Sequence, residues 1–289
     1  KNLLSTANYE LTGDEPERRM EMERYEKIMK GIHDHFEEAL QYFPKDNIVG
    51  SFLQGSQNYG LDTENSDIDT KLIVTPTFED LALNKQPQST THVRANEEHI
   101  DFKDIRLYID CFRKQNLNFL EILFTDYFIV NPLYAEQWQR LVDAREDIAH
   151  MNPYRSMQSM AGMCAEKNHA LQHRYPAKQH IIDEHGYDGK QVSHQERVRH
   201  AMMKYAAGES YWNCIHEPFE PYYLKMLKRH GLKCEEAVAL SNWSLEQTKA
   251  LRDEFCQTHP NSEDETTLAL LRDVQKEIMK ISVKKELSV

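Results

Sequence analysis

Apolar side chains recur at helical spacing near the start of the chain. Between residues 14 and 43 they fall on one side of a helical projection, at Tyr25, Ile28, Met29, Ile32, Phe36 and Leu40. Residues three and four apart share one face of a helix. The pattern therefore predicts an amphipathic helix with one buried stripe.

Four short apolar or alternating runs follow and predict β-strands over residues 47–53, 66–75, 91–95 and 97–105. Residues 104–124 return to helical periodicity, and only helical patterns occur after residue 131. The change falls near Asn131-Pro132 or Asn152-Pro153. We expect an α+β fold, with a mixed sheet and flanking helices over residues 1–130 and an all-helical C-terminal domain over residues 131–289.

Two aspartates open the second predicted strand. In a strand, residues two apart point to the same side, so Asp67 and Asp69 project together while Ile68 points into the core. Neighbouring carboxylates repel each other unless a cation lies between them. Mg²⁺ suits the pair because it prefers a few carboxylates together with substrate phosphate oxygens.

The turn before these aspartates offers a complementary anion site. Gly55 has no Cβ, so a phosphate could approach the backbone there, and Ser56 offers a hydroxyl and an N–H at the start of a short predicted helix. Taken alone, an Asp-x-Asp pair or a Gly-Ser pair is common in plain turns. Joined within residues 47–76, the two features favour a site that binds metal and phosphate.

Charge limits the class of partner. The 289 residues carry a net charge of −12 with a pI of about 5.6, which argues against broad non-specific binding to DNA. Residues 151–230 differ, with 11 Lys and Arg against 8 Asp and Glu, a local balance of +3, and eight of the 14 histidines. That surplus could face a phosphate, and the alternative is ordinary helix surface.

Cysteine usage and hydropathy bear on localisation. The five cysteines are far apart and form no Cys-x-x-Cys pair, which is typical of a reducing compartment. No apolar run approaches the length of a membrane span, and the first residues lack the apolar core of a signal peptide. We expect a cytoplasmic protein without a membrane partner.

The segments "GSQNYGL" (55–61) and "SDIDTKLIV" (66–74) together resemble the nucleotidyltransferase superfamily related to DNA polymerase beta. The resemblance implies a nucleotidyltransferase-type sheet and two Mg²⁺ ions, with Mn²⁺ as the alternative, bound by Asp67 and Asp69. It also implies a third carboxylate from a later strand. Asp101 is the better candidate because it lies between apolar neighbours, whereas Asp104 is placed to cap the following helix.

A closer resemblance is to predicted stand-alone nucleotidyltransferases of bacteria and phages, carried also by "NLNFLEILFTDYFIVNP" (116–132) and "GYDGKQVSHQERVRHA" (186–201). In that group a helical C-terminal half carries a Lys-x-x-Ser-His-x-x-Arg stripe. Here Lys190, His194 and Arg197 match it and would share one helix face. The segment after the histidine is more polar than the group's pattern, so Arg199 is a rival to Arg197. The alternative is a solvated polar face.

The resemblance implies transfer of a nucleoside monophosphate from an NTP such as ATP to an acceptor hydroxyl, with release of pyrophosphate. Gly55 and Ser56 would hold the β- and γ-phosphates, and Asp101 would complete the acceptor-side metal site and help to activate the acceptor. The acceptor could be an RNA 3′ end, a protein side chain or a small molecule. Two alternatives are a catalytically silent nucleotide-binding or antitoxin-like module of the same fold and a helical adaptor. The adaptor leaves the pattern of residues 47–76 unexplained.

Overall fold

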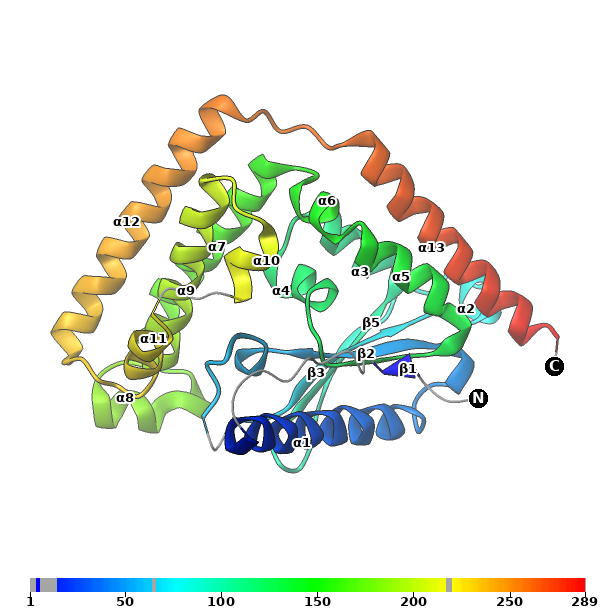
Figure 1. Cartoon of the computed structure of the whole chain (residues 1–289), viewed down its shortest axis with the longest axis horizontal. Coiled ribbons are helices and arrows are strands. Elements are labelled where there is room, and N and C mark those ends of the chain that lie inside the picture. The colour runs from blue at the N-terminus through cyan, green and yellow to red at the C-terminus, as the bar shows by residue number, and fades with distance from the viewer. Residues whose placement is uncertain (1–3, 6–14, 64–65, 217–219, 289) are drawn as a thin grey trace.

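A mixed β-sheet lies between two layers of helices in the computed structural model, which describes residues 4–5, 15–63, 66–216 and 220–288 (Figure 1). Six strands form the sheet in the order β1-β6-β2-β3-β5-β4. Their bounds are Leu4–Ser5 (β1), Ile48–Gln54 (β2), Asp69–Val74 (β3), Ser89–Val93 (β4), His99–Asp104 (β5) and Phe128–Val130 (β6). The β3–β5 pair is parallel and the other pairs are antiparallel.

The long N-terminal helix covers one face of the sheet. Helix α1 (Glu15–Ala39) buries Ile28, Ile32 and Phe36 against apolar side chains of the central strands, including Leu72 and Ile100. Burial of this kind stabilises by about 25 cal/mol per Å² of apolar surface. The predicted amphipathic stripe is therefore the contact that fixes α1 under the sheet (Figure 1).

A larger hydrophobic core lies on the other face and includes residues from both halves of the sequence. Helices α3 (Ile105–Arg113) and α5 (Ala135–Asp143) contribute to it. Phe52 of β2 packs on Trp138 of α5 with ring centres 4.3 Å apart. This packing joins the sheet directly to the helices that follow it.

The C-terminal half is a helical assembly built around α9 (Gly189–Ala206). Helices α7 (Pro153–Ala170), α11 (Pro221–Lys228) and α12 (Cys234–Thr258) pack against it. Helix α13 (Glu265–Glu286) leaves this assembly and returns to the sheet, along α3 and α5 (Figure 1). There the Ser282 hydroxyl hydrogen-bonds the Thr75 hydroxyl at 2.7 Å, just after β3.

Short helices complete the chain. They are α2 (Phe78–Ala82), α4 (Leu117–Leu120), α6 (Arg145–His150), α8 (Gln179–His185) and α10 (Tyr211–His216), with 3-10 turns at Lys45–Asn47, Ser56–Tyr59, Glu121–Leu123, Pro132–Tyr134 and Pro176–Lys178. Within the described ranges, no helix is long and apolar enough to cross a membrane. All five cysteines are free thiols.

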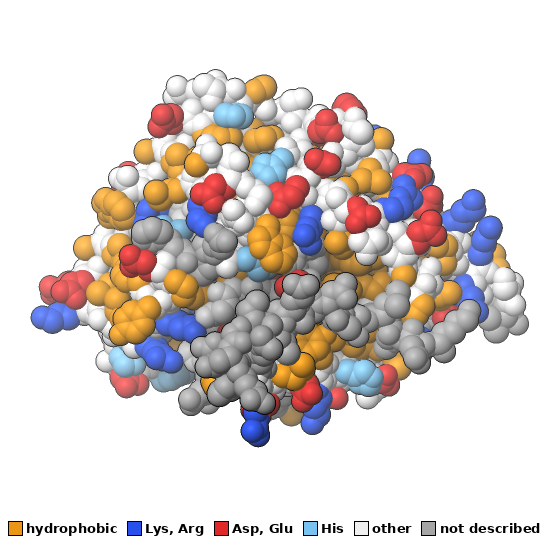
Figure 2. Space-filling view, viewed as in Figure 1, with side chains coloured by type: hydrophobic (Ala, Val, Ile, Leu, Met, Phe, Trp, Pro, Cys, Tyr) orange, Lys and Arg blue, Asp and Glu red, His pale blue; other side chains and the backbone are white. Residues whose placement is uncertain are grey.

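Acidic and basic side chains alternate over the described part of the face shown in Figure 2, most visibly along the helices at the right of the view. Lys and Arg do not gather into one large patch there. The basic side chains that matter most for the site lie instead around an internal pocket.

The predicted fold class is confirmed: the protein is α+β, with a mixed sheet, flanking helices and a helical C-terminal half. Three details differ from the prediction. The single helix expected over residues 104–124 is broken at Gln115, whose φ of +54° ends α3 before α4 begins. Strands β1 and β6 and helix α2 were not predicted, because two to five residues are too short to display a period. Strand β3 begins at Asp69, so Asp67 precedes it.

Candidate active site

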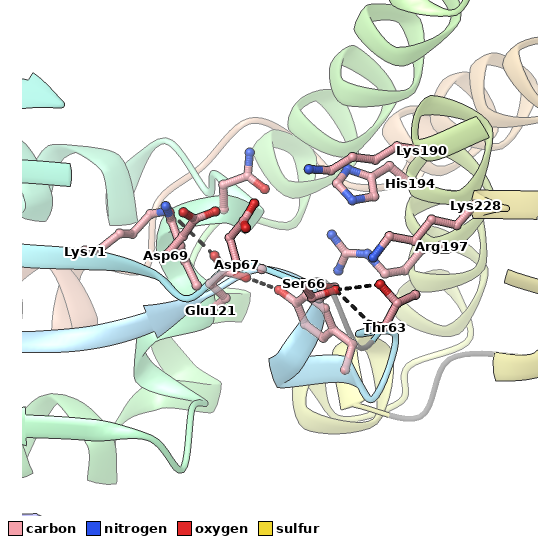
Figure 3. Close-up of a pocket in the computed structure, with 15 residues that line it drawn as sticks. Thr63, Ser66, Asp67, Asp69, Lys71, Glu121, Lys190, His194, Arg197 and Lys228 are labelled. Carbon is pink, nitrogen blue, oxygen red and sulfur yellow. Dashed lines mark hydrogen bonds and ion pairs between the residues drawn. The ribbon is translucent and has the colours of Figure 1, made fainter. Parts of the chain in front are cut away.

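A pocket of about 330 Å³ lies where the connection from β2 to β3 faces α9 and α11 (Figure 3). It is lined by Gln54, Gly55, Ser56, Tyr59, Thr63, Ser66, Asp67, Asp69, Lys71, Asn118, Glu121, Lys190, His194, Arg197 and Lys228. Seven of the eight site residues predicted from the sequence are in this set, and Asp101 is the exception. Residues more than 100 positions apart in the sequence thus meet in one pocket.

The Gly55-Ser56 turn forms one edge of the pocket. Gly55 has φ +92° and ψ −157°, a region open almost only to glycine. A Cβ at this position would meet no atom within 4 Å, so backbone conformation rather than crowding requires glycine. Ser56 then begins a 3-10 helix that ends at Tyr59. Asn58 fixes the turn by donating from Nδ2 to the Leu53 carbonyl at 3.0 Å.

Asp67 and Asp69 form the acidic wall. Ile68 between them is buried against α1, as the strand pattern predicts, and both aspartates line the pocket. Asp69 Oδ1 accepts a hydrogen bond from the His99 backbone N–H at 2.8 Å and lies 3.2 Å from the His99 ring nitrogen Nδ1. Gln57 donates from Nε2 to the Asp67 carbonyl at 3.2 Å, which ties the backbone of the aspartate segment to the turn.

Four basic side chains form the opposite wall and extend toward the aspartates (Figure 3). Lys190, His194 and Arg197 come from one face of α9, which confirms that they share a helix face, and Lys228 comes from α11. Arg199, the rival candidate, is absent from the pocket lining. Its guanidinium pairs with Glu196 at 2.9 Å.

The close packing of α9 on α11 explains how these groups meet. Gly189 begins α9 so near to α11 that a Cβ there would lie 2.5 Å from the Leu227 carbonyl oxygen. One turn further, the buried Ser193 hydroxyl donates to the Leu224 carbonyl at 2.8 Å. These two contacts bring Lys228 beside the Lys190 and His194 side chains.

The basic wall is electrostatically strained. Burial lowers the pKa of His194 well below its usual value, and the neighbouring charges of Arg197 and Lys190 lower it further. Burial likewise lowers the pKa of Lys228, with Lys190 the next contributor. Positive charges held together in this way are stabilised by an anion, so the wall is suited to bind one.

A buried polar network forms the floor. The Tyr59 hydroxyl donates to Glu121, and burial together with the Glu121 charge raises the tyrosine pKa. Glu121 lies 3.6 Å from the Lys71 ammonium, which also donates to Gln54. The Arg197 guanidinium lies over the Tyr59 ring, 4.1 Å from its centre. The network therefore links α9 to the strand that carries Asp69.

Neither candidate for the third carboxylate joins the pocket lining. Asp101 pairs in register with Lys71, and its Oδ1 accepts a hydrogen bond from the Thr91 hydroxyl at 2.7 Å. Asp104 is buried and caps α3, accepting from the Arg106 backbone N–H at 2.8 Å and pairing with the Arg106 guanidinium. The capping alternative considered for Asp104 is confirmed.

The donor set suits a Mg²⁺ ion bound jointly with phosphate. Asp67 is exposed, and within the described residues its carboxylate makes no ion pair or hydrogen bond. Mg²⁺ is commonly held by one or two carboxylates plus phosphate oxygens and waters. Asp67 and Asp69 supply that number. Groups of three or more metal-ligating side chains are absent from the described residues.

Sequence reasoning missed the floor and one of the four side chains of the basic wall, Lys228. Lys71 is a charged residue next to the apolar end of β3, two positions after Asp69 and therefore on the same face as Asp67 and Asp69. Glu121 lies in an apolar segment that predicts a packed side chain, and it is buried, but it also lines the pocket. The alternation of faces along the strand could have identified Lys71 as a neighbour of the two aspartates. Nothing local in the sequence indicates that Lys228 or Tyr59 would line the same pocket.

No protein-family model matches the sequence, and no curated protein matches it significantly. Among solved structures, the chain is similar to a nucleotidyltransferase-like protein from Exiguobacterium sibiricum. The match has a TM-score of 0.32 and 9% sequence identity, and it covers 78% of this chain and 75% of the other. At this level of similarity the match does not bear on the chemistry of the pocket.

Proposed function

We propose that the protein is a Mg²⁺-dependent nucleotidyltransferase, which moves a nucleoside monophosphate from an NTP to an acceptor hydroxyl. One observation carries the proposal: an aspartate pair faces four basic side chains across a single pocket. A bound NTP complements both walls, because its metal ion meets the carboxylates and its phosphates meet the cations.

In this proposal each group of residues binds a different part of the substrate. Asp67 and Asp69 hold the ion, which supplies charge stabilisation at the reacting phosphorus. The Gly55-Ser56 turn and the basic wall hold the β- and γ-phosphates, so that the pyrophosphate is oriented as leaving group. The acceptor oxygen forms a bond to the α-phosphorus, the bond from that phosphorus to the α,β-bridging oxygen breaks, and the hydroxyl proton passes to solvent.

The two-domain division at residue 130 belongs to the same proposal. The N-terminal domain supplies the aspartates and the turn, and the C-terminal domain supplies Lys190, His194, Arg197 and Lys228. A sheet domain alone would leave a triphosphate facing water, where a positive side chain contributes least. The acceptor remains one of three classes: an RNA 3′ end, a protein hydroxyl or a small molecule.

Calorimetric titration of the full chain with each NTP, with and without Mg²⁺, separates the candidate functions. The enzyme binds an NTP in a Mg²⁺-dependent way and turns it over once an acceptor is present. A silent nucleotide-binding module binds without turnover under any acceptor condition. A helical adaptor does neither, and absence of NTP binding in both conditions would reject the proposal.

A further inference from the structure

We propose that this pocket works with one divalent cation rather than two, and that the ammonium of Lys71 occupies the position of the second ion, on the acceptor side. The inference rests on the proposed function and deepens it. It replaces the two-ion arrangement expected from the resemblance. Three features of the described residues carry it.

The first feature is the register between β3 and β5. Thr70 pairs with Ile100 and Lys71 with Asp101, and Asp69 bonds to His99. The β5 residue beside the metal-binding aspartate is therefore a histidine, and Asp101 lies two residues further along the strand. Asp101 is absent from the pocket lining, and its Oδ1 is engaged by the Thr91 hydroxyl of β4 at 2.7 Å. Asp101 is thus not placed as a third ligand.

The second feature is the state of the Asp69 carboxylate. Its Oδ1 is already engaged by the His99 N–H and faces the His99 ring nitrogen. Two ions about 3.5–4 Å apart in a shared site need a carboxylate that offers an oxygen to each of them. Asp69 keeps one oxygen without such a bond, which is enough for an ion shared with Asp67.

The third feature is the Lys71 ammonium itself. Lys71 follows Asp69 by two residues on the same face of β3, and its side chain lines the pocket while being almost fully buried. Gln54 and Glu121 hold the ammonium, and it lies 5.3 Å from the centre of the Phe119 ring. A second divalent cation beside this fixed positive charge would be repelled at short range and low dielectric.

The same fixed charge can do the electrostatic work of the missing ion. A preorganised donor aimed at developing negative charge costs no reorganisation during the reaction. Lys71 is preorganised because Gln54 and Glu121 hold its ammonium in the floor of the pocket. We therefore assign it to the non-bridging oxygens of the α-phosphoryl group, on the side from which the acceptor approaches.

The ion count tests the inference directly. The full chain is loaded with an NTP analogue that has a methylene between the α- and β-phosphorus, and Mn²⁺ is titrated while EPR spectra are recorded. We expect one bound Mn²⁺ per chain and no exchange coupling. Two coupled ions would overturn this inference and leave the proposed function standing. Failure of the analogue and Mn²⁺ to bind would overturn both.

A pair of variants tests the role of Lys71. Lys71→Met alone would leave Glu121 buried without its cation, so Lys71→Met is combined with Glu121→Gln, which keeps an acceptor for Tyr59. We expect kcat to fall by about a hundredfold, with the Kd of the analogue within about threefold. Lys103→Met is the matched control, because Lys103 lies over the same Phe119 ring at 5.1 Å but outside the pocket. An unchanged kcat in the double variant would contradict the assignment.

Discussion

Asp67 and Asp69 differ in how the protein holds them, so their substitutions separate catalysis from stability. Asp67 is exposed, and its carboxylate has no partner within the described residues, whereas Asp69 accepts the His99 backbone N–H. Each carboxylate contributes to the proposed ion site. The same chemical change therefore has a different structural cost at each position.

We predict that Asp67→Ala abolishes turnover with an equal or higher Tm, because removing one carboxylate relieves repulsion in the unliganded pocket. Asp69→Asn keeps an oxygen for the His99 N–H and should also abolish turnover. Asp69→Ala should cost about 1 kcal/mol of unfolding free energy in addition. Asp34→Asn, at an exposed position on α1, is the control. Thermal unfolding and NTP turnover are the measurements, and activity retained in a double Asp67/Asp69 variant would reject the proposed chemistry.

The depressed pKa of His194 gives a second prediction at the scale of single residues. The ring is neutral near pH 7 in the free protein, because burial and the charges of Arg197 and Lys190 disfavour the imidazolium. A bound triphosphate would favour the charged form and raise that pKa, so binding takes up a proton and affinity rises as pH falls through the raised pKa.

Calorimetry in two buffers of different ionisation enthalpy measures this proton uptake. We expect wild-type protein to show a buffer-dependent enthalpy, and His194→Asn to lose most of the difference. Equal enthalpies in both buffers for the wild type would show that the phosphates do not approach His194.

Helix α9 carries three of the four basic groups, and its position depends on its contact with α11. Gly189 allows that contact, since a Cβ would lie 2.5 Å from a backbone oxygen. The helix as a unit, rather than any single cation, should therefore set the affinity for phosphate.

We predict that Gly189→Ala lowers the free energy of unfolding by about 1–3 kcal/mol and raises the KM for NTP. The matched control is Gly162→Ala on α7, where an added Cβ meets no atom within 4 Å. That change should stabilise by about 0.5–1 kcal/mol, because alanine is the better helix former. Chemical denaturation and steady-state kinetics check both, and a KM unchanged in a destabilised Gly189→Ala protein would separate α9 placement from binding.

Removing a positive charge should weaken NTP binding only where the side chain lines the pocket. Lys190→Ala, His194→Ala and Lys228→Ala should each raise the KM for NTP far more than they change stability, and the affinity of the wild type should weaken as salt rises. Lys225→Ala, on α11 but outside the pocket, should do neither. If Lys190→Ala and His194→Ala leave affinity and turnover unchanged, the C-terminal half serves another purpose, such as acceptor binding.

Helix α10 supplies a stability prediction that does not involve the substrate. His216 ends this helix with its ring stacked on Trp212 at 3.9 Å, and burial lowers its pKa to about 4. Between about pH 4 and 6.5 the unfolded chain binds the proton and the folded protein does not. Stability therefore falls as pH is lowered through this window, by at most about 1.4 kcal/mol per pH unit from this group. His216→Gln should reduce the slope in urea unfolding, and an unchanged slope would contradict this.

Periodicity predicted the elements that place the site, and tertiary packing determined the rest. The α1 stripe extends over several turns, so spacing alone identified it. The α9 stripe was identified through the family resemblance, and its spacing then placed the three side chains on one helix face. Gln115 breaks the expected 104–124 helix because its side chain donates to the Phe112 and Ile148 carbonyls, and the second of these is distant in sequence. The displacement of Asp101 depends on the β3–β5 register, which no local pattern encodes.

In the whole molecule, two oppositely charged walls from distant parts of the sequence share one pocket, and the hydrophobic core is continuous between the halves. A pocket assembled in this way opens or closes only if α9 and the β2–β3 connection move relative to each other. The contact between Tyr59 and Arg197 joins these two segments. Substrate binding and the association of the two halves should therefore be coupled.

Label transfer from α-³²P NTPs tests the central claim most directly. The purified full chain is incubated with each labelled NTP, Mg²⁺ and fractions of a host lysate, and RNA, protein and small-molecule products are separated. We predict that label enters one acceptor class with stoichiometric release of pyrophosphate, and that Asp67→Asn with Asp69→Asn abolishes the transfer. Absence of label in every fraction despite Mg²⁺-dependent NTP binding, or equal labelling by the double variant, would contradict the account.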